Sequence, residues 1–251
     1  LKDLIASECF PVVMLTRIFR QAQESDIVVN AHKINRGEPV LLDNKSRDFF
    51  FLQRQDPNII LRVVLALVQE KMPRYVNAEI SDIQVLTPMR KGALGVDNLN
   101  RVLQRYLNPE DKDKAEIPFG HGVAAEDGGT GKGILRVGDK VMQIRNNYDK
   151  DVFNGDVGRI VFLDGKERTL SVRYDDRVVP YDFDELDELT PAYAISIHKS
   201  QGSEYPAVVI PLMMQHYVLL QRNLVYTGVT RGKKLVVLVG ESRALHMAVK
   251  N

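Results

Sequence analysis

The chain has 251 residues, of which 44% are hydrophobic and 27% are charged. This composition is that of an ordinary soluble globular protein, and it excludes a collagen-like, low-complexity or largely disordered chain. No stretch approaches the roughly 18 apolar residues of a membrane span, and no secretory signal is visible. The single cysteine, Cys9, excludes a disulfide framework and a cysteine-rich zinc module. These features predict a cytoplasmic protein without a membrane partner.

Charge is distributed unevenly along the chain. The net charge is +1, but residues 151–190 carry 11 acidic and 5 basic side chains, a net of −6, which leaves +7 for the remainder. The sequence therefore predicts a basic body with an acidic insert. The first residue is Leu1 instead of Met, which indicates that the chain begins inside a longer protein.

The first part of the chain alternates between predicted strands and helices. Apolar runs predict strands at residues 12–19, 48–52 and 83–86. Amphipathic patterns predict helices that begin after Ser25, cover residues 58–71 up to a stop near Pro73, and cover residues 94–107. This alternation favours an α/β fold in which helices cover both faces of a parallel sheet.

The pattern changes after this alternating region. Residues 108–133 are rich in Gly and Pro and lack periodicity, which predicts a long, partly mobile loop. Further on, short alternating runs are separated by turn dipeptides such as Asp164-Gly165, a strong hairpin signal. Residues 151–190 are therefore expected to form a small antiparallel barrel inserted into the α/β domain, whose pattern returns at Tyr193.

One glycine-rich segment superficially resembles a phosphate-binding loop. Residues 128–132 read GGTGK, but the P-loop requires G-x-x-x-x-G-K-[ST] between a strand and a helix. Glu126 occupies the first glycine position, Gly133 occupies the Ser/Thr position, and no apolar strand precedes the segment. The chain also lacks an aspartate pair after an apolar strand, as in a Walker B motif. The sequence thus predicts that this chain does not bind and hydrolyse a nucleotide by itself.

The segment 194–205, AISIHKSQGSEY, places a polar cluster and a turn glycine at the end of an apolar strand. Open α/β sheets bind ligands at the carboxyl ends of their strands. The donors suited to phosphate oxygens are His198, Lys199, Ser200 and Gln201. Gly202 permits close backbone approach, and Glu204 is an acceptor suited to a ribose hydroxyl or a metal-bound water. A polar turn without chemical consequence is an equally good interpretation of the spacing.

Four further segments carry weaker signals. Arg231 ends a predicted helix within NLVYTGVTRGKK, where an Arg-Gly pair is also an ordinary helix C-cap. Arg20 follows an apolar strand in IFRQ, a place where most arginines are solvated or form surface ion pairs. Thr87 begins TPMRKG, a hydroxyl followed by two cations that could hold a phosphate backbone. Asn146 and Asn147 stand beside a tyrosine, a combination suited to a stacked base.

Taken in order, these segments resemble the C-terminal half of superfamily 1 DNA helicases. The similarity runs through LTRIFRQAQESDIVVNAHKIN, VLTPMRKGALGVDNLN, GDKVMQIRNNYDKDVFNGDVG, AISIHKSQGSEY and NLVYTGVTRGKK. It is strongest to the RecD-like branch, the family of the exodeoxyribonuclease V alpha chain and its stand-alone relatives. It covers nearly the whole chain apart from residues 108–133. Conjugative relaxase-helicases share much of the pattern and are the nearest alternative.

In this family two RecA-like domains enclose ATP, and the chain resembles the second of them. The resemblance implies a RecA-like domain 2A at residues 1–150 and 191–251 and an SH3-like 2B subdomain at residues 151–190. It implies that Arg20 and Arg231 are arginine fingers on the γ-phosphate, where planar, permanently charged donors are needed. The residues implied to face ATP are Gln21, Gly202 and Glu204. Those implied to contact single-stranded DNA are Thr87, Pro88, Asn146, Asn147, His198, Lys199, Ser200 and Gln201.

The function implied by the resemblance is that of the C-terminal motor domain of an ATP-dependent helicase that moves 5′ to 3′ on single-stranded DNA. ATP and Mg²⁺ would be held mainly by the N-terminal RecA-like domain of the same protein. Subunits of a nuclease complex are further candidate partners, and no metal site is expected in this chain. The helicase region of a conjugative relaxase and a non-catalytic single-stranded-DNA-binding module are the alternative functions.

Overall fold

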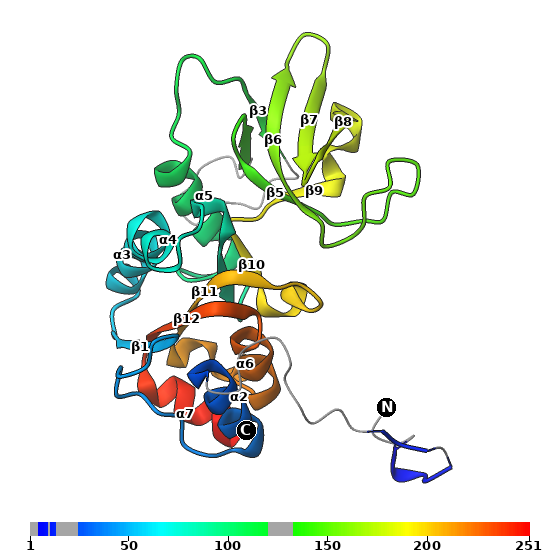
Figure 1. The fold of residues 1–251 in the computed structure, drawn as a ribbon. Coiled ribbons are helices and arrows are strands. Elements are labelled where there is room, and N and C mark those ends of the chain that lie inside the picture. Colours follow the sequence, from blue (N-terminus) through cyan, green and yellow to red (C-terminus); the bar gives the residue numbers. More distant parts are fainter. Residues whose placement is uncertain (1–4, 10, 14–24, 120–132) are drawn as a thin grey trace.

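The computed structural model describes residues 5–9, 11–13, 25–119 and 133–251. Figure 1 shows two units: a larger body built around a parallel sheet, which holds the C-terminus, and a smaller unit of antiparallel strands above it. The chain leaves the body after α5 (Val96–Leu107) and returns through β9 (Leu189–Pro191) to β10 (Ala194–Ser196). No helix among these described residues is long and apolar enough to cross a membrane.

The body contains a five-stranded sheet whose strands all run in parallel. Its order is β1 (Phe49–Gln53), β12 (Gly232–Gly240), β11 (Tyr205–Leu212), β2 (Ile83–Thr87) and β10. The near-continuous apolar sequences of β11 and β12 are those of strands covered on both faces. Successive side chains alternate between the faces, so Val208 and Ile210 enter one core cluster and Val209 enters the other.

Helices cover both faces of this sheet. The core cluster around Val208 includes apolar side chains from α2 (Asp26–Arg36), α6 (Arg222–Val229) and α7 (Ser242–Lys250). The cluster around Val209 includes side chains from α3 (Pro57–Ala66) and α5. The predicted fold class, a parallel sheet with helices on both faces, is thereby confirmed.

The helix that begins with α3 runs farther than the sequence predicted. It continues through the π-helical turn η1 (Leu67–Lys71) into α4 (Met72–Val76), past the expected stop at Pro73. Proline is tolerated there because it lies in the first turn of α4, directly after the π-helical turn. At this position the missing backbone N–H of proline removes no hydrogen bond that the helix needs. The helix ends where Asn77 adopts a left-handed conformation, and η2 (Ile80–Asp82) then leads into β2.

The smaller unit contains a five-stranded antiparallel sheet in the order β8-β7-β6-β5-β9. Its other elements are β5 (Lys140–Gln143), β6 (Val157–Asp164), β7 (Thr169–Tyr174), β8 (Arg177–Asp182) and the 3-10 turn η3 (Phe183–Glu188). The hairpin signal at Asp164-Gly165 is confirmed, because this turn connects β6 to β7. The pairing runs from β8 at one edge to β9 at the other, so closure into a barrel stays a prediction.

Strand structure in the smaller unit starts earlier than residue 151. β3 (Glu116–Phe119) pairs antiparallel with β4 (Gly133–Arg136), so part of the loop expected at residues 108–133 is a strand. Ile117 belongs to the same buried cluster as the five-stranded sheet. β3 escapes recognition in the sequence because it is only 4 residues long and contains Pro118, which is tolerated at a sheet edge. Residues 120–132 of the expected loop lie outside the described residues.

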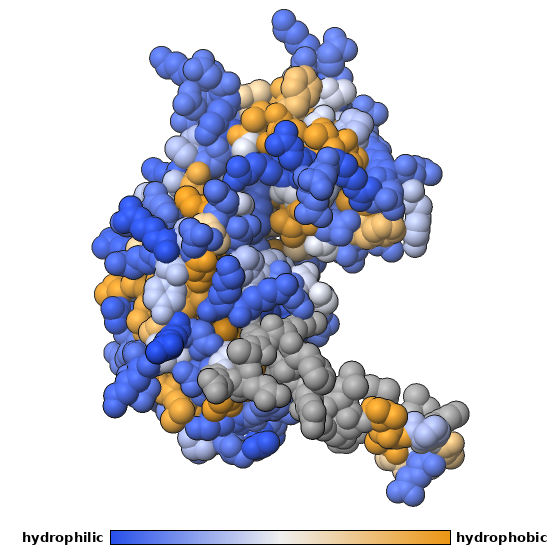
Figure 2. Space-filling model, in the orientation of Figure 1, coloured by the Kyte–Doolittle hydropathy of each residue, from blue (hydrophilic) through white to orange (hydrophobic). Residues whose placement is uncertain are grey.

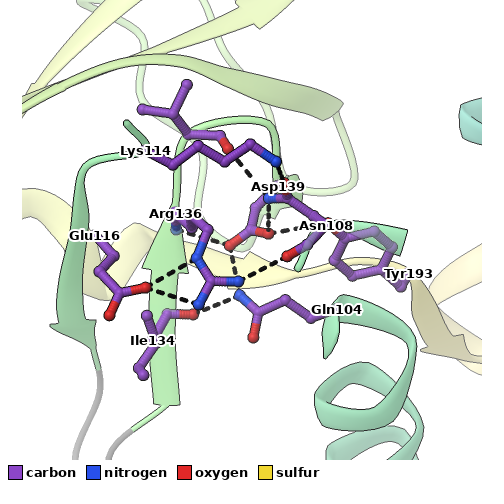
Figure 3. A network of polar contacts seen from close by, with 9 residues as sticks. Gln104, Asn108, Lys114, Glu116, Ile134, Arg136, Asp139 and Tyr193 are labelled. Atoms are coloured by element: carbon purple, nitrogen blue, oxygen red, sulfur yellow. Dashed lines mark hydrogen bonds and ion pairs between the residues drawn. The ribbon is translucent and has the colours of Figure 1, made fainter. Parts of the chain in front are cut away.

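A buried polar network, shown in Figure 3, joins the smaller unit to the body. Asp139 lies between β4 and β5, is 0% exposed and accepts four hydrogen bonds. The donors are Gln104 Nε2 (2.6 Å), Asn108 Nδ2 (2.7 Å), the Arg136 backbone N–H (2.8 Å) and the Tyr193 hydroxyl (2.9 Å). The Arg136 guanidinium also binds Glu116 in β3 and the Asn108 carbonyl. The network therefore connects α5, β3 and β4 with the segment at Tyr193, where the chain returns to the body.

Lys140, the residue after Asp139, makes a second contact between the units. Its Nζ donates to the Ser81 carbonyl, just before β2 (2.7 Å), and to Oε1 of Gln84, within β2 (2.9 Å). Burial lowers the pKa of Lys140 to about 8, and the nearby charge of Asp82 only partly opposes this effect. The protonated form is therefore less favourable in the folded protein than in the unfolded chain.

We expect the folded protein to become more stable as the pH rises from 7 to about 9.5. In this range the folded protein releases the Lys140 proton near pH 8, while the unfolded chain keeps it up to about pH 10.5, so the unfolded state binds more protons. The expected gain is roughly 2 kcal/mol in the free energy of unfolding, measured by urea unfolding followed by circular dichroism.

The trend should reverse above about pH 10. Burial raises the pKa of Tyr174 and of Tyr193, so their protonated forms stabilise the folded state and this contribution is lost as the pH rises further. A Lys140→Met variant should lose the rise between pH 7 and 9.5. The same rise in that variant would show that another group causes it.

Candidate functional site

Two loops that carry predicted site residues begin side by side at one edge of the parallel sheet. β2 and β10 are neighbours, and Thr87 at the end of β2 pairs with Ser196 at the end of β10. β10 continues into the 3-10 turn η4 (Ile197–Ser200), and β2 continues into the loop 88–95 before α5. Because both strands run in parallel, the polar residues that follow them are brought to the same edge, where open α/β sheets place ligands.

The turn η4 separates its residues into a buried and an exposed set. Ile197 and Ser200 are three residues apart, so they share one side of the 3-10 turn, and both are buried. The Ser200 hydroxyl donates to the Ile197 carbonyl (2.7 Å), so its proton is directed into the protein. The predicted site residues of this loop that face solvent are His198, Lys199 and Gln201.

The loop after β2 presents cations to solvent, whereas the hydroxyl of Thr87, at the end of β2, points inward. Thr87 is 0% exposed, and its Oγ1 donates to the Leu94 carbonyl (2.7 Å), which closes the loop onto the end of β2. Pro88 is buried as well. Both side chains are therefore turned away from solvent, and their predicted contact with DNA stays a prediction. The exposed cations of the same loop are Arg90 and Lys91.

Positive charge from the two loops converges. Partial burial, and then the charge of Arg90, lower the pKa of Lys199, which places these two cations near one another. Gly95 makes the shape of the first loop possible, because a Cβ there would lie 2.4 Å from the Lys91 carbonyl oxygen. Sequence reasoning missed Gly95, because the predicted helix began at residue 94 and enclosed this glycine, whereas α5 begins at Val96.

Arg231 lies between α6 and β12, where its guanidinium donates hydrogen bonds to Thr227, Thr230 and Ser203. Nε donates to the Thr227 carbonyl (3.0 Å), and Nη2 donates to Thr230 Oγ1 (3.1 Å). Nη1 donates to the Ser203 carbonyl (3.1 Å), in the loop that follows η4. Arg231 is half-buried, and its planar group is already oriented next to this loop.

The predicted nucleotide-facing residues Gly202 and Glu204 flank the carbonyl that Arg231 contacts. Gly202 has φ +89°, a left-handed conformation that favours glycine. Glu204 forms an ion pair with Lys233 (2.5 Å), and 27% of its side chain stays exposed. Three of the residues predicted for the ATP site are thus brought together. The other two predicted residues, Arg20 and Gln21, lie outside the described residues.

Asn146 and Asn147 lie in the loop 144–156, between β5 and β6. Asn146 Oδ1 accepts a hydrogen bond from the Asn154 N–H (2.9 Å), and Asn147 Nδ2 donates to Glu188 Oε2 (3.1 Å). Both amides therefore shape the loop. A pocket of about 640 Å³ lies between the base of this loop and residues 203–205, and Figure 2 shows a recess in the surface between the two units.

A second pocket, of about 260 Å³, lies next to η4. Its polar lining comes from His198 and Gln201, from Gln221, and from Asn223 and Thr227 of α6. In the described part of the chain, no group of three or more His, Cys, Asp or Glu side chains could hold a metal ion. The edge around η4 instead gathers guanidinium, ammonium, imidazole and amide donors, which suit phosphate groups.

Two family models match this chain. The UvrD-like helicase C-terminal domain matches residues 191–239, which include η4, β11, α6 and Arg231. The ATP-dependent RecD-like DNA helicase SH3 domain matches residues 99–174, which include β3 through β7. A Bacteroides Pif1 helicase solved in complex with ADP-AlF3 and ssDNA shares the fold, with a TM-score of 0.53 and 19% identity over 90% of this chain and 51% of that chain. The fold is that of the C-terminal, RecA-like part of a superfamily 1 helicase.

Similar proteins of known name place the chain in one family of superfamily 1 helicases. The ATP-dependent RecD2 DNA helicase of Deinococcus radiodurans is 34% identical over 245 residues, which are 98% of this chain and 31% of that protein. The RecBCD enzyme subunit RecD of Mycolicibacterium smegmatis is 29% identical over 174 residues, which are 69% of this chain and 28% of that protein. The chain corresponds to the C-terminal region of the RecD-like superfamily 1 helicases. It spans about a third or less of the length of these relatives.

Proposed function

We propose that the chain is the C-terminal motor domain of an ATP-dependent DNA helicase that moves 5′ to 3′ on single-stranded DNA. The observation that carries this proposal is the loop 196–204. It bears the exposed His198 and Lys199 near its start and Glu204, beside Arg231, at its end. One short loop with donors for a nucleic-acid backbone at one end and nucleotide-facing groups at the other can couple the two ligands.

Arg231 and Glu204 would supply one half of an ATP site. A planar, permanently charged guanidinium suits the γ-phosphate oxygens, and a carboxylate suits a ribose hydroxyl. The other half, with Mg²⁺, would belong to an N-terminal RecA-like domain of the same protein, since the chain contains no G-x-x-x-x-G-K-[ST] sequence. Arg20 and Gln21 are proposed to complete the nucleotide side.

The DNA side would consist of the exposed residues of the two neighbouring loops. Lys199 would neutralise a phosphate, with His198 and Gln201 as further donors. Arg90 contacts Asp97 at 3.5 Å, but its side chain is 76% exposed, so it would reach a second phosphate. Buried residues, namely Thr87, Pro88 and Ser200, would act by holding these loops in shape. Asn146 and Asn147 would do the same for the loop 144–156. Subunits of a nuclease complex are further candidate partners, because several relatives are named as RecBCD subunits.

Replacing Lys199 by alanine is expected to weaken single-stranded DNA binding and to lower its salt dependence. Each lost phosphate contact removes counterion release, so the slope of log Kobs against log salt should become shallower by about 0.7 for a single strand. The measurement is fluorescence anisotropy of a labelled oligonucleotide with the full-length protein over a salt series. Arg90→Ala should act in the same direction.

A matched control removes an equal charge elsewhere. Arg168 is exposed, forms an ion pair with Asp184 and lies on the β6–β7 turn of the smaller unit, so Arg168→Ala should leave the slope unchanged. An unchanged slope in Lys199→Ala and Arg90→Ala, or an equal change in Arg168→Ala, would remove the two loops from the DNA path.

A further inference from the structure

The loop 144–156 exposes two aromatic rings to solvent. Tyr148 is 76% exposed and Phe153 is 39% exposed. Their ring centroids are 5.9 Å apart, and the ring planes stand at 76°, an edge-to-face arrangement. Phe153 thus supports one side of Tyr148 and leaves the tyrosine ring open to water.

Polar contacts within the loop, next to both rings in the sequence, hold its backbone in shape. Asn147 and Val152 form an antiparallel bridge that closes the loop between the two rings. The Asp156 carboxylate accepts from the Phe153 N–H (2.8 Å), next to the bond between Asn146 and Asn154. A loop built this firmly around two exposed rings keeps them oriented instead of letting them fold onto the surface.

The cations on and beside this loop are engaged with carboxylates. Lys150, whose side chain is 19% exposed, binds Glu185 (2.6 Å), and Arg145 binds Asp187 (2.7 Å). Arg177 binds Asp151 from the neighbouring strand. The loop is therefore poorly suited to gripping phosphates, and the chemistry that it offers to a ligand is an aromatic face.

The position and size of the ring pair favour a nucleobase as its ligand. The base of the loop and residues 203–205 line the same pocket of about 640 Å³. Arg177, which binds Asp151 within the loop, lines this pocket as well, so the loop that carries the rings starts beside residues 203–205. A protein partner would need on the order of 800 Å² of complementary surface, whereas two rings among charged residues match the face of a single base.

We propose that Tyr148, supported by Phe153, is a stacking platform for an unpaired base of the bound DNA strand. This inference rests on the proposed function, because the same strand would pass the cations of the loops 88–95 and 196–204. The platform would contact the base, while the cations contact phosphates. The acidic smaller unit would thereby take part in DNA binding without attracting the backbone.

The test compares Tyr148→Ala and Tyr148→Phe in the full-length protein, using anisotropy with an oligo-dT strand over a salt series. Loss of the ring should raise Kd about tenfold. The salt slope should not change, because stacking releases no counterions. Tyr148→Phe keeps the ring and should keep most of the affinity. Phe162→Ala removes an aromatic side chain that is 51% exposed on β6 of the same sheet, and it should have no effect.

The outcomes separate this inference from the proposed function. If the wild-type protein binds DNA with the expected salt dependence but Tyr148→Ala binds equally well, the stacking platform is wrong and the helicase proposal stands. If the wild-type protein does not bind single-stranded DNA, the helicase proposal itself fails. A loss in Tyr148→Ala that also makes the salt slope shallower would indicate a disturbed phosphate contact and would overturn the assignment of stacking. Unchanged thermal unfolding of Tyr148→Ala is expected, since the ring lies in solvent.

Discussion

Replacing Arg231 by alanine in the full-length protein is expected to lower kcat for ATP hydrolysis about 10³-fold or more, the usual scale for an arginine finger. The guanidinium is held by contacts to Thr227, Thr230 and Ser203 and needs little reorientation to meet a phosphate. Affinity for single-stranded DNA should change little, because the exposed donors at the start of the loop 196–204 stay in place. The measurement pairs steady-state ATPase kinetics with DNA-binding anisotropy on the same samples.

Arg231→Lys is the informative companion variant. Lysine keeps the charge but lacks the planar set of donors, so turnover should stay close to that of Arg231→Ala. Because the Ser203 contact also holds the loop, thermal unfolding of both variants must be compared with the wild type. A loss of DNA binding with unchanged ATP turnover would assign Arg231 to the DNA side and would exclude it as a finger. If this chain hydrolysed ATP at the full rate without the N-terminal RecA-like domain, the ATP site could not be divided between two domains.

The parallel sheet and the loop 196–204 could be predicted because their signals are local. Continuous apolar runs mark strands buried on both faces, and a polar cluster with a glycine marks the end of one of them. The direction of individual side chains could not be predicted in the same way. Thr87 ends β2 and Ser200 lies in the turn after β10, and both carry hydroxyls, yet each donates to a nearby carbonyl inside the protein. In η4 the three-residue repeat of the turn decides which side chains face water, and this repeat is invisible until the turn type is known.

The limits of the smaller unit could not be predicted because its start depends on contacts between distant residues. Glu116 binds Arg136, and Asn108 binds Asp139, across the glycine-rich segment that separates them in the sequence. Taken one at a time, these polar and charged residues look like those of a loop. Only their pairing shows that β3 and β4 belong to the folded unit and that Asp139 is a central residue of the protein.

Replacing Asp139 by alanine is therefore expected to lower the free energy of unfolding by roughly 3–5 kcal/mol, the range for removing one partner from a buried charged network. The carboxylate is fully buried, and each of its oxygens accepts two hydrogen bonds. Its loss would leave Gln104, Asn108 and Tyr193 with buried donors that have lost their acceptor. The measurement is the urea midpoint and slope by circular dichroism, with oligonucleotide binding as a second readout.

Two matched variants show whether the loss of stability comes from the broken network or from replacing any residue in this region. Asp139→Asn preserves shape and one acceptor oxygen, so it should be destabilised less than Asp139→Ala. Glu116→Gln alters the rim of the same network, where the side chain is 35% exposed, and should cost at most about 1 kcal/mol. If Asp139→Ala unfolds at the wild-type urea concentration, the two units are joined by other contacts, of which Lys140 is the next to test. If it unfolds in two steps, the smaller unit separates from the body before the body melts, and Asp139 is the residue that makes the two unfold together.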